Sequence, residues 1–156
     1  VETLHRSKPA DVETEVFVYG KIPLAFSARC FTARHYDLNK DDCQFKCLDH
    51  AEGLTLKTRE GQDFLCINGI QTMSAQSYNL LHEIPEMLKM GIDIIRISPQ
   101  KQHINEIIAA FDAARRGEVV TADSKGWNPC GLVDGYWFGD AGIVQRHTQA
   151  LEQMGA

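Results

Sequence analysis

Apolar residues recur along the chain with two different periods, and these periods predict where strands and helices lie. Short runs rich in β-branched and aromatic residues, bounded by Gly, Pro or Asp, are typical of strands. Such runs occupy residues 16–20, 24–27, 64–68 and 93–98. Alternation of apolar and polar residues before the third run predicts a hairpin over residues 52–68. The intervening residues 21–23 and 69–77 are expected to be connectors, the second with a helical tendency.

A period close to 3.6 residues predicts two helices in the second half of the chain. Residues 83–90 and 103–116 carry apolar side chains on one face, and a glycine follows each segment. Pro85 suits the first turn of the earlier helix, where its missing N–H costs nothing. Residues 1–6 are expected to be the end of another helix.

The order of these elements predicts the class of fold. Strand, helix, strand and helix follow one another over residues 64–116, which is typical of α/β units with parallel strands. A complete eight-unit barrel needs about 250 residues, and this chain has 156. We therefore expect residues 1–156 to form a single α/β domain, either a small sheet or the later part of a longer barrel. Beyond residue 118 the periodicity is weak, and an irregular but ordered tail over the body is expected.

Composition narrows the class of protein without identifying it. The chain is 44% hydrophobic and 24% charged, which is ordinary for a globular protein. A net charge of -5 disfavours nucleic acid as the main partner, and no apolar run approaches the ~20 residues of a membrane span. The first residue is Val rather than Met, so the chain is expected to be processed or to belong to a longer protein. Five cysteines without a secretory signal favour a reducing, cytoplasmic location.

Three of these cysteines lie in one polar segment, which is the most informative part of the sequence. Cys30, Cys43 and Cys47 fall within or at the edge of a predicted loop over residues 28–49, a long loop of the kind that is usually functional. The spacing C-x12-C-x3-C allows the last two thiols to share a face of a helical turn. Iron–sulfur cubanes take four thiolates without one fixed spacing, so this segment predicts most of such a site. Within the chain, Cys66 is a candidate for the fourth ligand and Cys130 a weaker one. The fourth ligand could also come from missing sequence or from another chain.

Other interpretations of the same segment stay open. His35 or His50 could complete a zinc site with the three cysteines, although the spacing differs from the paired C-x2-C of zinc sites. Arg29 and Arg34 flank the first cysteine, where they could offset the charge of a cluster or simply lie at the surface. Buried cysteines that only fill a core are also common.

Substrate-binding residues are harder to assign. Asn68 and Arg96 lie at or near predicted strand ends, where α/β proteins place their chemistry. Substrate contact is one interpretation of each, and the alternative is that it satisfies local backbone groups or forms a salt bridge. The motifs of serine hydrolases, zinc proteases, P-loop proteins and dinucleotide-binding proteins are absent from the sequence.

One stretch of the sequence resembles the signature of a known protein family. Residues 15–30, EVFVYGKIPLAFSARC, resemble the signature of the collagenase-like peptidase family, in which a strand ending in Gly leads to an aromatic-Ser-Gly/Ala-Arg-Cys element. A cysteine usual in that signature, near Pro23 and Leu24, is absent. This departure and the spacing of the three cysteines are similar to the UbiV branch of the family. The resemblance continues through FLCINGIQTMSAQ, GIDIIRISPQ and GYWFGDAG.

The resemblance implies a function that the residues alone do not. Proteins of the UbiV branch act in oxygen-independent ubiquinone biosynthesis, pair with a UbiU-type homologous subunit as a heterodimer, and support hydroxylation of a lipid-like quinone precursor. It further implies a [4Fe–4S] cluster on four cysteines, three of which match Cys30, Cys43 and Cys47, with the fourth in an N-terminal half that this chain lacks. The implied fold is the C-terminal half of a TIM-barrel-like protein. A collagenase-like peptidase and a non-catalytic subunit with structural zinc are the alternatives.

Overall fold

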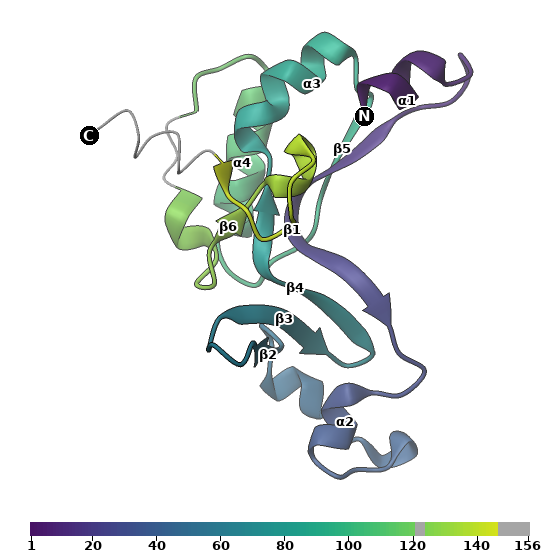
Figure 1. Ribbon diagram of the computed structural model, residues 1–156, viewed down its shortest axis with the longest axis vertical. Coiled ribbons are helices and arrows are strands. Elements are labelled where there is room, and N and C mark those ends of the chain that lie inside the picture. The colour runs from purple at the N-terminus through teal and green to yellow at the C-terminus, as the bar shows by residue number, and fades with distance from the viewer. Residues whose placement is uncertain (121–123, 147–156) are drawn as a thin grey trace. The chain divides into compact units, whose positions relative to one another are not determined.

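The computed structural model describes residues 1–120 and 124–146, which form a mixed α/β structure (Figure 1). The helices are α1 (Glu2–Ser7), α2 (Phe31–His35), α3 (Ile84–Met90) and α4 (Ile104–Arg115). The strands are β1 (Glu15–Phe26), β2 (Leu54–Lys57), β3 (Asp63–Asn68), β4 (Gln71–Asn79), β5 (Ile94–Ile97) and β6 (Leu132–Val133). Hydrogen bonds order the strands β2-β3-β4-β1-β5, and β6 pairs with β4.

The described chain separates into two compact units. The first contains residues 1–20 and the described residues from 78 onward, and the second contains residues 21–77. The prediction of a single domain over residues 1–156 stays a prediction.

Both kinds of strand pairing occur, so the prediction of parallel α/β units is only partly right. Strands β1 and β5 pair in parallel, with Val16 opposite Ile95. Strands β2, β3 and β4 are successive antiparallel partners, with Cys66 opposite Met73 between the last two. Only Gly69 and Ile70 separate β3 from β4, and so short a connection permits antiparallel pairing alone.

Two segments that were predicted to be connectors are strands in the structure. Residues 69–77 were expected to be a connector with helical tendency, but most of them belong to strand β4. Residues 21–23 were expected to be a connector, but they lie inside the twelve-residue strand β1. Both segments lack a clear alternation of apolar and polar residues, and neighbouring strands decide their conformation.

The first unit has a core built around β1 and the two longer helices. Tyr19 on β1 is fully buried and meets the ring of Phe111 on α4 edge-to-face, with ring centroids 5.9 Å apart. Trp127 contacts the same tyrosine ring at 5.6 Å. Strand β1 passes close to the end of β5 at Gly20, where a Cβ would lie 2.5 Å from the Cβ of Ser98. Only glycine fits such an approach at a φ of +123°.

The helix predictions are confirmed. Helix α3 carries Pro85 in its first turn and ends at Gly91, whose φ of 79° is left-handed. Helix α4 buries its apolar face, including Ile107 and Phe111. The described part of the C-terminal tail contacts the start of α3, where Trp137 donates a hydrogen bond of 2.8 Å from Nε1 to Glu83. The tail also includes residues 121–123 and 147–156, which lie outside the described residues.

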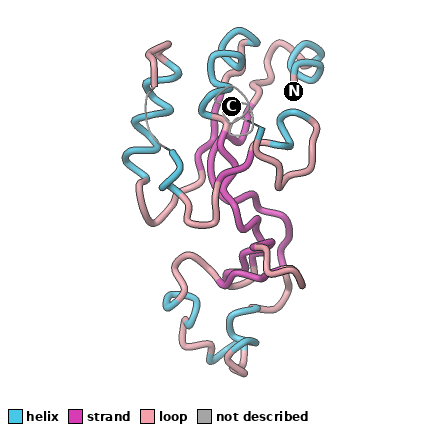
Figure 2. The backbone as a smooth tube through the Cα atoms, turned by 60° about the vertical axis from the view of Figure 1, so that its left-hand side comes forward, coloured by secondary structure: helices cyan, strands magenta, loops and turns pink. Residues whose placement is uncertain are grey.

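The second unit contains the predicted hairpin and the cysteine segment. Strands β2 and β3 form the hairpin, as the alternation predicts. Figure 2 shows that the rest of this unit consists of short helical turns separated by loops. These turns are α2 and two 3-10 segments, Lys40–Asp42 and Lys46–Asp49. In the described part of the chain, no helix has the length and apolar character needed to cross a membrane.

Candidate functional site

The first cysteine of the segment opens helix α2. Cys30 is its N-cap, with φ of −68° and ψ of 116°, and its Sγ accepts a hydrogen bond of 3.4 Å from the N–H of Ala33. Sulfur thus takes the place of the serine or aspartate oxygen that usually caps a helix. The thiol is half-buried and forms no disulfide.

Helix α2 is fixed to the turn between β3 and β4. The N–H of Phe31 donates to the carbonyl of Gly69 at 2.7 Å. In return the N–H of Gly69 donates to the hydroxyl of Thr32 at 3.0 Å. Thr32 and Ala33 are buried, so the first turn of α2 is held against the turn between β3 and β4. Cys30 therefore has a rigid support, which a ligand or a reactive thiol requires.

The loop that carries the other two cysteines is closed at its ends by side chains. The hydroxyl of Tyr36 and Nε2 of His50 are hydrogen-bonded, and their rings stack with centroids 5.7 Å apart. The ammonium group of Lys46 lies 5.9 Å from the centroid of the same tyrosine ring, within the range of a cation–π contact. Residues 36 and 50 are thus joined although the polypeptide between them is irregular.

Within this loop, Cys43 and Cys47 lie on either side of an unusual backbone. Gln44 and Phe45 both have left-handed conformations, with φ of 51° and 50°. Such φ values cost a non-glycine residue of the order of 1 kcal/mol or more and persist where the surroundings demand them, often at functional sites. Both cysteines are half-buried and free.

The three sulfurs were predicted to converge on one inorganic centre. Among the residues that the structure describes, no group of three or more His, Cys, Asp or Glu side chains is placed to hold a metal ion. The donors fit a cluster in kind, since all three are free thiols on one segment, but their present positions do not gather them. Their assignment as ligands therefore stays a prediction.

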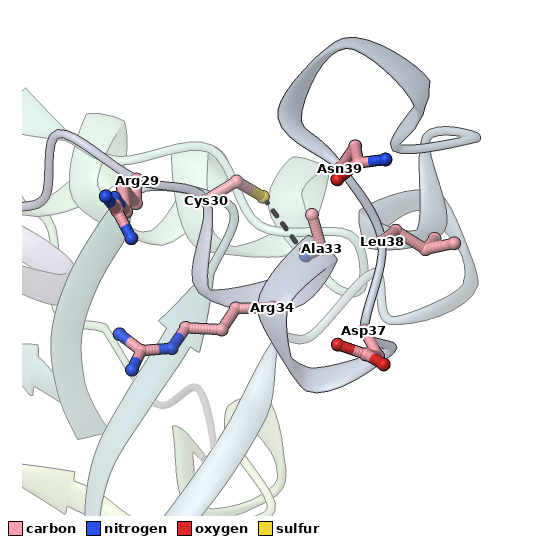
Figure 3. Close-up of a pocket in the computed structure, with 7 residues that line it drawn as sticks. All are labelled: Arg29, Cys30, Ala33, Arg34, Asp37, Leu38 and Asn39. Atoms are coloured by element: carbon pink, nitrogen blue, oxygen red, sulfur yellow. Dashed lines mark hydrogen bonds between the residues drawn. The ribbon is translucent and has the colours of Figure 1, made fainter.

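A shallow cavity of about 420 Å³ lies beside Cys30 (Figure 3). Arg29, Arg34 and Asp37 contribute its charged groups. Figure 3 shows the sulfur of Cys30 directed toward the N–H of Ala33, while both guanidinium groups extend away from that sulfur. Both arginines are exposed, which agrees with the surface interpretation.

Cys66 has a different environment from the other three. It is fully buried on β3. Its Sγ donates a hydrogen bond of 2.9 Å to the carbonyl of Glu52 and accepts one of 3.4 Å from Nζ of Lys21. Lys21 also donates to the Glu52 carbonyl at 2.7 Å. Service as a cluster ligand would require this sulfur to leave both partners.

Contacts within the fold engage three further sequence candidates, which are Arg96, Asn68 and His50. Arg96 pairs with Glu15 across β5 and β1. Asn68 reaches the carbonyl of His50 at 3.5 Å, a weak contact. His50 is also engaged with Tyr36, so it is not poised as a zinc ligand in this arrangement.

Sequence reasoning missed two contributors to this unit. Tyr36 was not singled out, although an aromatic residue inside a polar loop was a usable signal. Lys21 lies in a segment that the sequence predicts to be a connector, and its contact with Cys66 spans 45 positions. No local pattern encodes a contact across that separation.

Comparison with known proteins identifies the class. The model of peptidase family U32 matches residues 1–118, and the chain belongs to that family. The collagenase-like resemblance is thereby confirmed at the family level.

A particular relative adds detail. Over 127 residues, the chain is 26% identical to tRNA hydroxylation protein P1 of Bacillus subtilis (strain 168), covering 74% of this chain and 28% of that protein. The chain thus spans less than a third of the length of this curated relative. No solved structure matches the chain.

Proposed function

We propose that this chain is part of an iron–sulfur protein that acts in oxygen-independent hydroxylation. In this proposal Cys30, Cys43 and Cys47 are three ligands of a [4Fe–4S] cluster. The observation that carries it is the presence of three free thiols on one segment of a U32 family member. Similarity to a protein whose name includes hydroxylation supports the reaction class.

The local structure supports the choice of ligands. Cys30 sits on a rigid turn, whereas Cys43 and Cys47 sit in a loop whose ends are joined by Tyr36 and His50. The loop between residues 36 and 50 can change conformation while the contact between Tyr36 and His50 is kept. Such a movement would bring Cys43 and Cys47 toward Cys30. Left-handed backbone beside both loop cysteines is the kind of local strain that a bound ligand offsets.

The fourth ligand is assigned to sequence outside this chain. Cys66 is buried and holds both Lys21 and the carbonyl of Glu52, which disfavours its recruitment. This assignment agrees with the interpretation of the chain as the C-terminal half of a TIM-barrel-like protein. The same interpretation includes a UbiU-type homologous subunit as the partner.

The chain's own residues have defined roles in this proposal. A bound cluster would supply electron transfer, and its potential depends on charge and hydrogen bonds near the sulfurs. Arg29 and Arg34 bring positive charge to the cavity beside Cys30 and would offset the negative charge of a thiolate-ligated cluster. The N–H of Ala33 donates to the Cys30 sulfur, which lowers the electron density on that ligand.

Two substrate classes are compatible with this reaction. The first is a quinone precursor of ubiquinone biosynthesis, as the UbiV resemblance implies. The second is tRNA, which is favoured by the similarity to tRNA hydroxylation protein P1 but disfavoured by the net charge of -5. We place the quinone precursor first, because a tRNA-binding surface needs an excess of basic residues.

The deciding experiment is deletion of the gene. Ubiquinone with its precursors and the hydroxylated tRNA nucleosides are then measured in cells grown without oxygen. Loss of ubiquinone with accumulation of its less hydroxylated precursors, while tRNA nucleosides stay unchanged, is expected. Loss of a hydroxylated tRNA nucleoside with normal ubiquinone would replace the first substrate by the second. No change in either pool would contradict the proposed hydroxylation.

The two remaining alternatives have their own measurements. A collagenase-like peptidase would digest gelatin in a manner that survives loss of all three segment cysteines. A subunit with structural zinc would be colourless and contain zinc after purification without oxygen. Brown protein with equal amounts of iron and sulfide is the expected result.

A further inference from the structure

The contact between the half-buried Lys21 and the buried Cys66 is the strongest unexplained feature of the second unit. The two residues come from different strands, β1 and β3, and are 45 positions apart in the sequence. Their Nζ and Sγ atoms lie 3.4 Å apart. The cluster proposal uses neither side chain.

The Cys66 thiol and the Lys21 ammonium group both donate a hydrogen bond to the same carbonyl oxygen, that of Glu52. The Cys66 thiol donates to the Glu52 carbonyl at 2.9 Å, and the Lys21 ammonium donates to the same oxygen at 2.7 Å. Gly53 packs directly against the sulfur, because a Cβ there would lie inside van der Waals contact of the Cys66 sulfur. The thiol is fully buried, whereas Lys21 is half-buried. The pair is thus confined, and its two reactive atoms face each other.

We propose that oxidation joins Lys21 and Cys66 through a single oxygen atom, as a nitrogen–oxygen–sulfur bridge. Dioxygen is the oxidant. The Lys21 ammonium first gives one proton to solvent. The S–H bond of the thiol and one N–H bond of the resulting amine then break, and an S–O and an N–O bond form. One oxygen atom enters the bridge, and the other leaves as water with the two hydrogens. Nitrogen and sulfur give up two electrons each, which reduce both oxygen atoms.

Two physical arguments favour the bridge over simple oxidation of the cysteine. The amine is already at hydrogen-bond distance from the sulfur, so the second bond forms at high effective concentration. Burial limits further attack on the sulfur, whereas exposed thiolates proceed along the series of sulfenic, sulfinic and sulfonic acids.

A bridge between residues 21 and 66 would enclose the segment that carries Cys30, Cys43 and Cys47. Exposure to oxygen would thereby restrain the loop proposed to bind a cluster.

The bridge does not depend on the proposed function, and its test is chemical. The chain is prepared without oxygen, divided, and one half is exposed to air before digestion without reductant and mass spectrometry. We expect a cross-linked pair of peptides, containing Lys21 and Cys66, that is heavier than their sum by one oxygen and lighter by two hydrogens. Dithiothreitol should return both peptides to their free masses with release of water. The half kept without oxygen should contain no such pair.

Matched variants locate the bonded atoms. Lys21→Arg keeps the positive charge and should abolish the cross-link, and Cys66→Ser should do the same. Cys130→Ser should leave it unchanged. Circular dichroism spectra of all three should match the wild-type spectrum, and the wild-type measurement decides the question by itself if a variant does not fold.

Three results would overturn the inference. The first is a free Cys66 thiol after exposure that oxidises other cysteines of the chain. The second is sulfinic acid at Cys66 with an unmodified Lys21. The third is a cross-link that persists in Lys21→Arg. None of these results bears on the iron content of the protein, so failure of the bridge and failure of the cluster proposal are separable.

Discussion

Replacing Gly53 by alanine tests the packing around Cys66, and the chain provides a matched control. Gly53 and Gly61 have nearly the same left-handed backbone, with φ of +81° and +85°. A Cβ at Gly53 would overlap the Cys66 sulfur and lie 3.0 Å from the carbonyl oxygen of Ile67. A Cβ at Gly61 would meet no atom within 4 Å. The two variants therefore share the backbone cost and differ in the steric cost.

The expected magnitudes follow from these two terms. A left-handed alanine costs about 1–2 kcal/mol, of which the loss of freedom in the unfolded chain returns about 0.4–1 kcal/mol. Gly61→Ala should therefore lower the free energy of unfolding by about 1 kcal/mol. Overpacking of a buried site adds about 1–3 kcal/mol, so Gly53→Ala should cost about 2–4 kcal/mol.

The assay is urea unfolding followed by circular dichroism under reducing conditions. A double variant, Gly53→Ala with Cys66→Ala, removes the sulfur that the new methyl group would strike. We expect it to recover between about 0.5 and 3 kcal/mol relative to the sum of the single variants, as is found for residues in contact. Equal losses for Gly53→Ala and Gly61→Ala, with additivity in the double variant, would show that the described contact is absent.

Two further predictions concern the first unit. Burial, reinforced by the nearby charges of Asp134 and Glu83, raises the pKa of Tyr78 to about 12 from an ordinary 10. Because the folded state prefers the neutral phenol, this contribution to stability is complete below pH 10 and is lost as pH rises toward 12, by roughly 3 kcal/mol in total. Urea unfolding at pH 9 and 11.5 should show a smaller loss for Tyr78→Phe than for wild type, and an unchanged loss would contradict the raised pKa. Phe111→Ala should cost about 3–5 kcal/mol, because the ring is fully buried against Tyr19. The same substitution at the half-exposed Ile108 of that helix should cost much less, and similar midpoints for the two variants would contradict the packing of α4.

Much of the first unit could be predicted from the sequence because its signals are local. Helix α4 has a full apolar face and a terminal glycine, and α3 has Pro85 in its first turn. These features fix a helix within a few residues of their own position. The hairpin of β2 and β3 was predictable for the same reason, since its alternation and turn are contiguous.

The failures of prediction concern pairing between distant residues. Strand β4 contains several polar residues and presents no clear alternation, so its conformation is set by hydrogen bonds to β3. The contact between Lys21 and Cys66 also depends on the complete fold. In the cysteine segment, the sequence shows thiols that could act as metal ligands. The positions of Cys43 and Cys47 could not be predicted, because the loop between Tyr36 and His50 has no periodic pattern.

The central claim is that Cys30, Cys43 and Cys47 bind one iron–sulfur cluster. The most direct measurement is the iron and sulfide content of the full-length protein purified without oxygen, together with its visible spectrum. Wild type and Cys130→Ser should be brown, with four iron and four sulfide per chain expected of one [4Fe–4S] cluster. Cys43→Ser should lose most of that iron and colour, because one thiolate ligand is removed. Unchanged iron and an unchanged spectrum in Cys43→Ser would contradict the claim.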